Sequence, residues 1–358
     1  MHSLINHFRI AGLSVTTGSV RRSFIADGQA NGIPMAQLER VAKTIGLRDR
    51  MVSTPDVTAL DLCEDATRRL LSEMNLDASS IDAIIFVTQT PDHSQPNNAS
   101  LLHGRLGLSK STLAFDLAQG CAGWVTGLHQ AALLCAHGGA GRVLLCAGDT
   151  LSHLTNKNDR AADPLFGDAG SATIVERTGQ PNPMHFIFGA DGKGASSIIV
   201  PAGGARQPAS ELTRIETADT SGNLHHAENL HLDGAEIFNF SLREIPPAIQ
   251  SVMQHGGYTV ASTDALILHQ ANKFIVESVA LKVGFAKDKA PAGIVEKFGN
   301  QSSASIPCAL IDALGDALSQ KPLKLAGCGF GVGLSWGAFA GEVGPLILAP
   351  IQPYPASP

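Results

Sequence analysis

Short runs of apolar residues alternate with helix-like patterns along the whole chain. Residues 84–87 and 143–147 are apolar throughout, which predicts strands buried on both faces, and residues 113–117 are a third strand candidate. Ahead of the first strand, apolar residues recur at the spacing of one helix face, at Leu60, Cys63, Leu70 and Met74. Strands that alternate with helices predict a layered α/β fold.

Two stretches resemble each other at an offset of about half the chain. Residues 76–90 (LDASSIDAIIFVTQT) and 258–272 (YTVASTDALILHQAN) both pass through Ser-x-Asp-Ala into an apolar strand. The repeat predicts two related halves with an active site at their junction, although chance similarity between apolar strands is a second interpretation. The Gly and Pro residues of 178–183 predict a boundary, which gives halves of residues 1–178 and 184–358. The tail from Pro345 has five prolines and is expected to be an extended, partly mobile end.

Composition narrows the class of protein. The chain has 358 residues, 44% hydrophobic and 16% charged, which suits two domains or one large unit with a substantial core. Its net charge of -6 argues against a general nucleic-acid-binding protein. We find no secretory signal and no apolar run of the ~20 residues that a membrane span needs. The six cysteines show no CxxC pair and no metal-binding spacing, so reduced thiols in the cytoplasm and no metal site are expected.

Cys121 is the first candidate for chemistry. It follows the strand-like residues 112–120 (TLAFDLAQG) and precedes a helical pattern, so it is expected at a helix start. The unpaired N–H groups and the positive dipole of a helix start stabilise a thiolate, which predicts a lowered thiol pKa. The small neighbours Gly120 and Ala122 would let a substrate approach. The other interpretation is a buried cysteine that fills space under a tight turn.

His269 and Asn300 are the second and third candidates. His269 follows the apolar strand Ala265–Leu268, and ligands of α/β sheets gather at the carboxyl ends of strands. Asn300 lies in a turn that also offers helix-capping hydroxyls at Ser302, Ser303 and Ser305. If both side chains point into one pocket, their N–H groups form an oxyanion hole for an enolate. A structural histidine and an ordinary turn asparagine are the alternatives.

A glycine-rich segment near the C-terminus completes the candidate site. Residues 325–343 (LAGCGFGVGLSWGAFAGEV) have glycines at alternate positions, which let backbone pass close to a ligand. A backbone N–H from this segment can join that of Cys121 in a second oxyanion site. A plain glycine-rich strand turn is the alternative, and the segment does not match a P-loop.

Taken in their order along the chain, these motifs resemble those of the ketoacyl-acyl-carrier-protein synthase III family of thiolase-fold condensing enzymes. The resemblance rests on AFDLAQGCAGW around Cys121, LHQAN at His269 and FGNQSSASIPCAL at Asn300. FGDAGSA (166–172) and GFGVGLSWGA also match, and together the motifs extend from about residue 46 to residue 341. The resemblance implies an α/β thiolase-like fold, in which two similar halves form a five-layered αβαβα unit, and a homodimer.

The resemblance also implies an acyltransferase that forms carbon–carbon bonds. It assigns Cys121 as the residue acylated by an acyl-coenzyme A primer, and His269 and Asn300 as the pair that binds the thioester carbonyl of malonyl-acyl carrier protein. The backbone N–H groups of Cys121 and Val332 would bind the acyl oxyanion, although many family members have glycine at position 332. After loss of carbon dioxide, the enolate would attack the acyl-Cys121 thioester. Coenzyme A enters with the substrate, so no separate cofactor is implied.

Five positions concern substrate binding in this resemblance. Arg160 matches a coenzyme-contacting arginine of the family. Arg40 stands where a tryptophan that stacks on adenine is typical, and a guanidinium can stack or pair with phosphate. Phe274 replaces an arginine that contacts the acyl carrier, for which the adjacent Lys273 is a candidate substitute. Gln95 stands where a phenylalanine commonly closes the primer pocket across the dimer. These departures predict a specialised primer or pathway.

Three other functions remain open on the sequence. An acyltransferase to oxygen or nitrogen, without decarboxylation, would keep the same Cys and His. A degradative thiolase would need a second catalytic cysteine, for which Cys328 is the candidate, but the Gly-His-Pro motif of thiolases is absent. An inactive partner subunit would usually have lost Cys121, His269 or Asn300.

Overall fold

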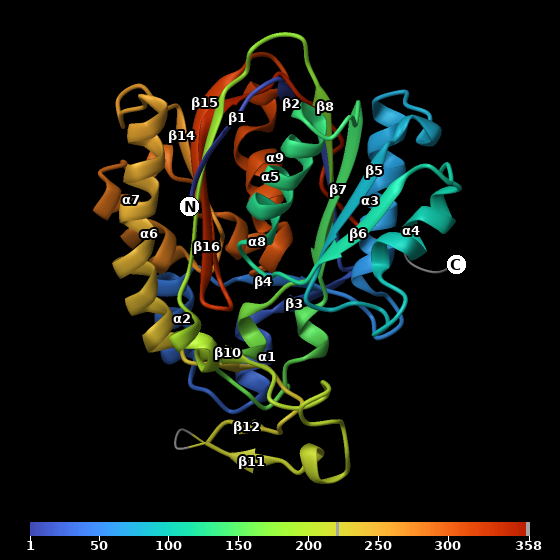
Figure 1. Ribbon diagram of the computed structural model, residues 1–358. Helices are drawn as coiled ribbons and strands as arrows, with labels where there is room; N and C mark the ends of the chain where they lie inside the picture. Colours follow the sequence, from blue (N-terminus) through green and yellow to red (C-terminus); the bar gives the residue numbers. More distant parts are fainter. Residues whose placement is uncertain (220–221, 356–358) are drawn as a thin grey trace.

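Two β-sheets and the helices between and around them form five layers in the computed structural model, which describes residues 1–219 and 222–355 (Figure 1). The first sheet has the strand order β1 (His2–Ile5), β9 (Met184–Ala190), β16 (Ser335–Val343), β15 (Leu323–Gly331), β14 (Ala265–Leu268). The second has the order β17 (Ile347–Leu348), β2 (Phe8–Thr17), β8 (Ala169–Arg177), β7 (Arg142–Asp149), β5 (Ala83–Val87), β6 (Leu113–Leu117), and β18 (Gln352–Pro353) also pairs with β2.

Helices separate the two sheets and cover their outer faces (Figure 1). The central layer contains α5 (Gly123–Ala136) and α9 (Ser305–Leu318). The outer layers are α6 (Gly234–Gly256) with α7 (Lys273–Val283) on the first sheet, and α3 (Ala59–Glu73) with α4 (Asn98–Leu106) on the second. One apolar cluster lies between the sheets around Trp124 and Phe339, and two others lie under the outer helices. Both faces of each sheet are therefore buried, and the expected five-layered thiolase-like fold is confirmed.

The predicted elements appear close to their expected ranges. The apolar runs at 84–87, 143–147 and 113–117 form β5, β7 and β6, and β5 is fully buried. β6 is the last strand on this side of its sheet, and its residues are half-buried or exposed, which suits the aspartate that interrupts its apolar run. The predicted helical stripe lies on α3, which starts with a capping box between Thr58 and Asp61.

Each end of the chain joins the sheet that is formed mainly by the other half of the chain. Residues 178–183 connect β8 of the second sheet to β9 of the first. However, the N-terminal strand β1 joins the first sheet beside β9, and the C-terminal strands β17 and β18 pair with β2 in the second. The proline-rich tail is extended as expected, but these pairings attach it to a sheet and do not leave it as a free end.

Smaller elements gather at one end of the molecule (Figure 1). They are α1 (Phe24–Ala30), α2 (Met35–Ile45), β3 (Val20–Ser23), β4 (Asp49–Val52), β10 (Ile198–Ile199) and the protruding β11 (Thr217–Ala218) and β12 (Leu224–His225). β13 (His231–Leu232) pairs with β10, and α8 (Ile294–Phe298) precedes Asn300. Within the described ranges, no helix has the length and apolar character to span a membrane.

Candidate active site

Cys121 lies in the turn between β6 and α5, two residues before the helix begins. A hydrogen bond from the Gly123 N–H to the Gly120 carbonyl (2.7 Å) closes this turn. The Cys121 Sγ lies 3.6 Å from the Ser302 Oγ. All six cysteines are free, and Cys121 is partly exposed whereas the other five are buried. The predicted nucleophile is therefore the accessible thiol of the protein.

The electrostatic surroundings of Cys121 differ from the expectation. Although the residue reaches the cavity, the protein atoms around it desolvate the sulfur, and this burial raises the pKa of the thiol to about 12. The Asp149 carboxylate acts in the same direction, while the Ser302 hydroxyl and the backbone N–H groups of Cys121 and Val332 oppose the rise. The predicted lowering of the pKa at a helix start is thus wrong, because desolvation is the larger effect.

His269 is held at the carboxyl end of β14, where its ring packs edge-on against Phe330. Its Nδ1 lies 2.7 Å from the Ser305 Oγ, which also accepts a hydrogen bond from the Gln270 N–H at 3.4 Å. Ser305 is fully buried, and of these two partners only Nδ1 can accept its proton. In the tautomer in which the Ser305 hydroxyl donates to Nδ1, His269 carries its proton on Nε2.

The His269 imidazole is neutral at physiological pH. Burial lowers its pKa to about 3, and the Ser302 carbonyl opposes this only in part. A neutral imidazole with a fixed tautomer can donate to a developing oxyanion without first losing or gaining a proton.

Hydrogen bonds of both its backbone N–H and its backbone carbonyl hold Asn300 in place. Its N–H donates to the Leu165 carbonyl (2.8 Å), and its own carbonyl accepts from the Gly167 N–H (3.0 Å). The side-chain Oδ1 accepts from the Ser302 N–H at 2.9 Å. This bond occupies the acceptor end of the amide, which leaves the Nδ2 group as a hydrogen-bond donor.

A cavity of about 110 Å³ brings these residues together. Cys121, His269, Asn300 and Val332 all line it. Its other walls are largely apolar, and include Leu151, Phe166, Ile198, Leu232, Ile275 and Phe330. The structure therefore places the cysteine of the first half and the His–Asn pair of the second around one space. Polar interactions are stronger in such apolar surroundings than in water.

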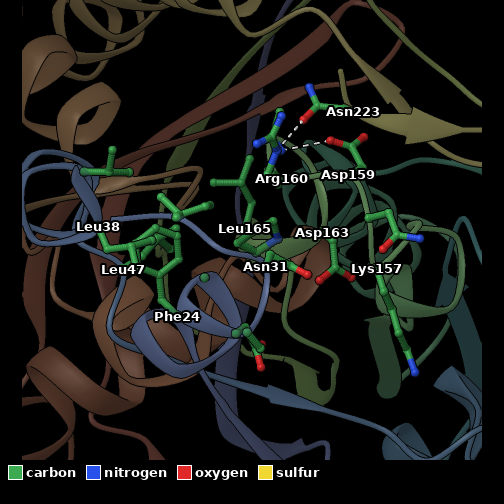
Figure 2. Close-up of a pocket in the computed structure, with 18 of the residues that line it drawn as sticks. Phe24, Asn31, Leu38, Leu47, Lys157, Asp159, Arg160, Asp163, Leu165 and Asn223 are labelled. Carbon is green, nitrogen blue, oxygen red and sulfur yellow. Dashed lines mark hydrogen bonds between the residues drawn. The ribbon is translucent and has the colours of Figure 1, made fainter. Parts of the chain in front are cut away.

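A larger outer cavity of about 630 Å³ adjoins the cavity of the candidate residues, and Leu165 lines both. α1 and α2 form one wall, and residues 157–165 with Asn223 form the other (Figure 2). Arg160, the predicted coenzyme contact, lines this cavity, and its Nε donates to the Asn223 Oδ1 at 3.4 Å. Leu165 therefore lies between the outer cavity and the cavity that Cys121 lines.

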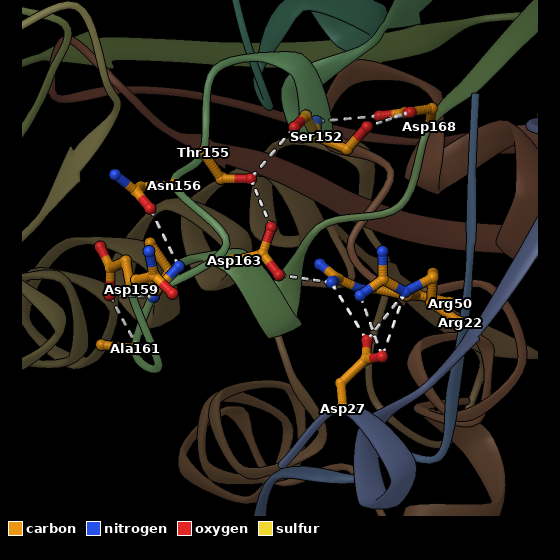
Figure 3. A network of polar contacts seen from close by, with 12 residues as sticks. Arg22, Asp27, Arg50, Ser152, Thr155, Asn156, Asp159, Ala161, Asp163 and Asp168 are labelled. Atoms are coloured by element: carbon orange, nitrogen blue, oxygen red, sulfur yellow. Dashed lines mark hydrogen bonds and ion pairs between the residues drawn. The ribbon is translucent and has the colours of Figure 1, made fainter. Parts of the chain in front are cut away.

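A polar network fixes the segment between β7 and β8 that forms this wall (Figure 3). The buried Arg50 pairs with Asp163, whose other carboxylate oxygen accepts from the Thr155 hydroxyl at 2.7 Å. Arg22 and Arg50 both pair with Asp27 of α1. These ion pairs hold α1 against the segment, so the charges of both arginines are already balanced.

The other predicted substrate contacts lie at the surface of the single chain. Arg40 is exposed on α2, and Gln95 is exposed in the loop before α4. Lys273, at the start of α7, pairs with Glu296 at 3.4 Å. Phe274 is 46% exposed and stacks on a phenylalanine of α6. Of the five predicted substrate-binding residues, the structure thus brings Arg160 to the outer cavity.

The serines beside Asn300 have contacts that the sequence did not predict. Neither the turn Ser302–Ala304 nor α9 has a side-chain cap, so the expected helix capping is wrong. Instead, Ser302 contacts Cys121 and Asn300, Ser305 contacts His269, and the Ser303 hydroxyl donates to the buried Asp149 at 2.7 Å. The signal for these contacts in the sequence is the three hydroxyl residues within five positions of a candidate catalytic asparagine.

The glycines of β15 let this strand pass directly against Cys121. A Cβ on Gly329 would lie 2.6 Å from the Cys121 carbonyl oxygen, and one on Gly331 would lie 3.0 Å from the Cys121 Sγ. The sequence predicted a close approach of this backbone to a ligand. The structure shows that the glycines closely approach Cys121 itself.

We therefore expect Gly329→Ala to destabilise the protein by about 1–3 kcal/mol, because the added methyl group overpacks the contact between β15 and Cys121. Urea unfolding measures this loss. Gly104→Ala on α4 is the matched control, since a Cβ there would have nothing within 4 Å. The control should be as stable as the unchanged protein or slightly more stable. Equal stability of the two variants would contradict the packing described here.

Comparison with known proteins agrees with this geometry. The family model of 3-oxoacyl-[acyl-carrier-protein] synthase III matches residues 115–192, and the model of its C-terminal part matches residues 253–343. These two matches include Cys121, His269, Asn300 and Val332.

Individual relatives cover most of the chain. A putative 3-oxoacyl-[acyl-carrier-protein] synthase 3 from Campylobacter jejuni is 36% identical over 301 residues, 84% of each chain. A β-ketoacyl-[acyl-carrier-protein] synthase III from Symbiobacterium thermophilum is 33% identical over 303 residues, 84% of this chain and 88% of its own. The solved structure of a 3-oxoacyl-(acyl-carrier protein) synthase from Burkholderia xenovorans has a TM-score of 0.91 and 36% identity, with 99% of both chains covered. The chain therefore belongs to the 3-oxoacyl-[acyl-carrier-protein] synthase III family and is a condensing transferase.

Proposed function

We propose that the protein condenses an acyl-coenzyme A primer with malonyl-acyl carrier protein and releases carbon dioxide. The observation that carries this proposal is the shared cavity, in which the thiol of Cys121 meets the neutral imidazole of His269 and the amide of Asn300. The curated relatives are named as synthases of acyl-carrier-protein substrates, which supports the same substrate class.

In the first step, the Cys121 thiolate attacks the thioester carbonyl of the primer. The carbonyl oxygen becomes an oxyanion, for which the backbone N–H groups of Cys121 and Val332 are the proposed donors. The carbon–sulfur bond to coenzyme A then breaks, and the departing thiolate takes up the proton that Cys121 released. The acyl group remains on Cys121, so one difficult reaction is divided into two easier ones.

In the second step, the malonyl thioester binds with its carbonyl oxygen against His269 and Asn300. As carbon dioxide leaves, the electron pair of the broken bond forms an enolate, and the two neutral donors stabilise its oxygen. The enolate carbon attacks the acyl-Cys121 carbonyl and forms the new carbon–carbon bond. Cys121 leaves as a thiolate, and a proton from water restores the thiol of the starting enzyme. Thiol, imidazole and amide supply this chemistry, so we propose no separate cofactor.

The substrates would enter through the outer cavity. Arg160 lines this space, and Arg40 lies on the neighbouring helix α2, so both are proposed to contact coenzyme A. For the acyl carrier, we propose contacts with Lys273 and Phe274 at the start of α7, which follows directly from the His269 segment. Gln95 is proposed to border the primer pocket of a second subunit.

A homodimer formed along β6 is also part of the proposal. β6 ends its sheet, so one side of its backbone has no strand partner within the described chain. Leu113 on this strand is 48% exposed. A second copy paired along β6 would cover the edge, which otherwise favours uncontrolled association. We further propose a cytoplasmic location, which the six free thiols support.

Incubation with acyl-coenzyme A primers of rising chain length, followed by malonyl-acyl carrier protein, tests the function. We expect mass spectrometry to show an acyl adduct on Cys121, and release of carbon dioxide together with a β-ketoacyl product. An adduct followed by transfer to an alcohol or amine without carbon dioxide release would show a different acyltransferase. A strict preference for acetyl primers would contradict the predicted specialised primer.

A further inference from the structure

Ser302 contacts one residue from each of the two proposed steps, Cys121 and Asn300. Its hydroxyl is 3.6 Å from the Cys121 Sγ, and its backbone N–H donates to the Asn300 Oδ1 at 2.9 Å. Ser302 is 1% exposed and has a φ of 47°, a left-handed conformation that is uncommon for a residue with a side chain. Such conformations persist where the surrounding contacts hold them, and they cluster at active sites. A single strained residue thus contacts both the nucleophile and the amide donor.

Gln89 orients the Ser302 hydroxyl. The Gln89 Nε2 donates to the Ser302 Oγ at 2.9 Å, so the hydroxyl oxygen accepts there and its own hydrogen remains for another partner. Gln89 is itself fixed, because its backbone N–H donates to the Asp149 Oδ1 at 2.7 Å. Two acceptors lie near the Ser302 hydroxyl, the sulfur of Cys121 and the buried carboxylate of Asp149.

Asp149 already has several donors. Its oxygens accept from the Gln89 N–H (2.7 Å), from the Ser303 N–H (3.2 Å) and from the Ser303 hydroxyl (2.7 Å). A thiolate at Cys121 has fewer groups that can stabilise it, because His269 is neutral and the charge of Asp149 repels the sulfur anion. The sulfur anion must therefore be stabilised by neutral donors, and Ser302 is the side chain that contacts it.

We propose that Ser302 is a catalytic residue, whose hydroxyl donates a hydrogen bond to the Cys121 thiolate while its backbone N–H holds Asn300 as a donor. The inference rests on the proposed function in that it takes Cys121 as the nucleophile. Ser302 would thus act in both the acylation and the decarboxylation step. A change of its hydroxyl would affect the first step, and a displacement of its backbone would affect the second.

Alkylation of Cys121 by iodoacetamide tests this proposal without any acyl substrate. Cys121→Ala gives the background from the five buried cysteines. In Ser302→Ala, we expect the alkylation rate at each pH from about 6 to 9 to fall roughly 10- to 100-fold, because the thiolate loses a hydrogen bond. The matched variant is Ser302→Gly, since glycine adopts the positive φ freely but supplies no hydroxyl. It should lose the same reactivity.

Two results would overturn the role of the hydroxyl. One is an unchanged alkylation rate in Ser302→Ala. The other is a slow rate in Ser302→Ala with a normal rate in Ser302→Gly, which would assign the effect to backbone strain. If Ser302→Ala does not fold, Ser302→Gly decides the question by itself. Slow alkylation in both variants supports the role of the Ser302 hydroxyl even if the unchanged protein forms no acyl adduct. The proposed function and the role of Ser302 can therefore fail separately.

Discussion

Cys121→Ala is expected to abolish the acyl adduct and all condensation while the decarboxylation of malonyl-acyl carrier protein continues. In the proposed mechanism, Cys121 holds the acyl group, whereas the enolate is stabilised by His269 and Asn300, which remain in the same cavity. The measurement combines mass spectrometry of the protein with separate assays of carbon dioxide and of the β-ketoacyl product. The expected result is carbon dioxide without product.

Cys121→Ser is the conservative companion variant. It keeps the size and a hydroxyl, but a serine without an adjacent base is a weak nucleophile, so acylation should remain negligible. An adduct on any of the five buried cysteines, or condensation by either variant, would contradict the assignment of Cys121.

His269→Ala and Asn300→Ala should give the opposite pattern, with Cys121 still acylated and carbon dioxide release reduced. Each variant removes one donor to the enolate oxygen, a loss that typically slows the chemical step by roughly 10²–10³-fold. Single-turnover assays of acylation and of decarboxylation separate the two effects. Asn300→Asp tests the donor directly, because it keeps the size and the Oδ1 acceptor but loses the amide N–H groups.

A matched histidine control is His103→Ala on α4, whose ring contacts the Ser109 carbonyl at the surface. This variant should condense normally.

Because burial lowers the pKa of His269 to about 3, the imidazole does not titrate near neutrality. We therefore expect decarboxylation to show no histidine-like transition between about pH 5 and pH 9. Loss of acylation in the His269 and Asn300 variants equal to the loss of decarboxylation would contradict these roles.

The local elements around the site could be predicted because they follow from short stretches of sequence. The apolar run Ala265–Leu268 indicated a buried strand that delivers His269 at its end, and the structure has that strand as β14. The strand-to-helix pattern around Cys121 placed the thiol at a helix start, where it lies. The order of the motifs then indicated the family, which the comparisons confirm.

The electrostatics of the site could not be predicted in the same way. A helix start lowers a thiol pKa only if its effect exceeds the cost of desolvation, and the sequence does not show how deeply Cys121 is desolvated. The serines were interpreted as helix caps because that is their commonest use beside a helix. Their hydroxyls instead point to partners such as Cys121, which is 181 residues from Ser302 in the sequence.

By itself, the sequence determined the layered α/β architecture and the strands around the site, and it predicted the three candidate residues Cys121, His269 and Asn300. Only the tertiary structure decided that one cavity joins them, that burial lowers the pKa of His269, and that Ser302 contacts both the sulfur and the amide. The reason is physical. Periodicity and turn chemistry act over a few residues, whereas desolvation and hydrogen-bond partners are set by segments that meet only when the two sheets pack.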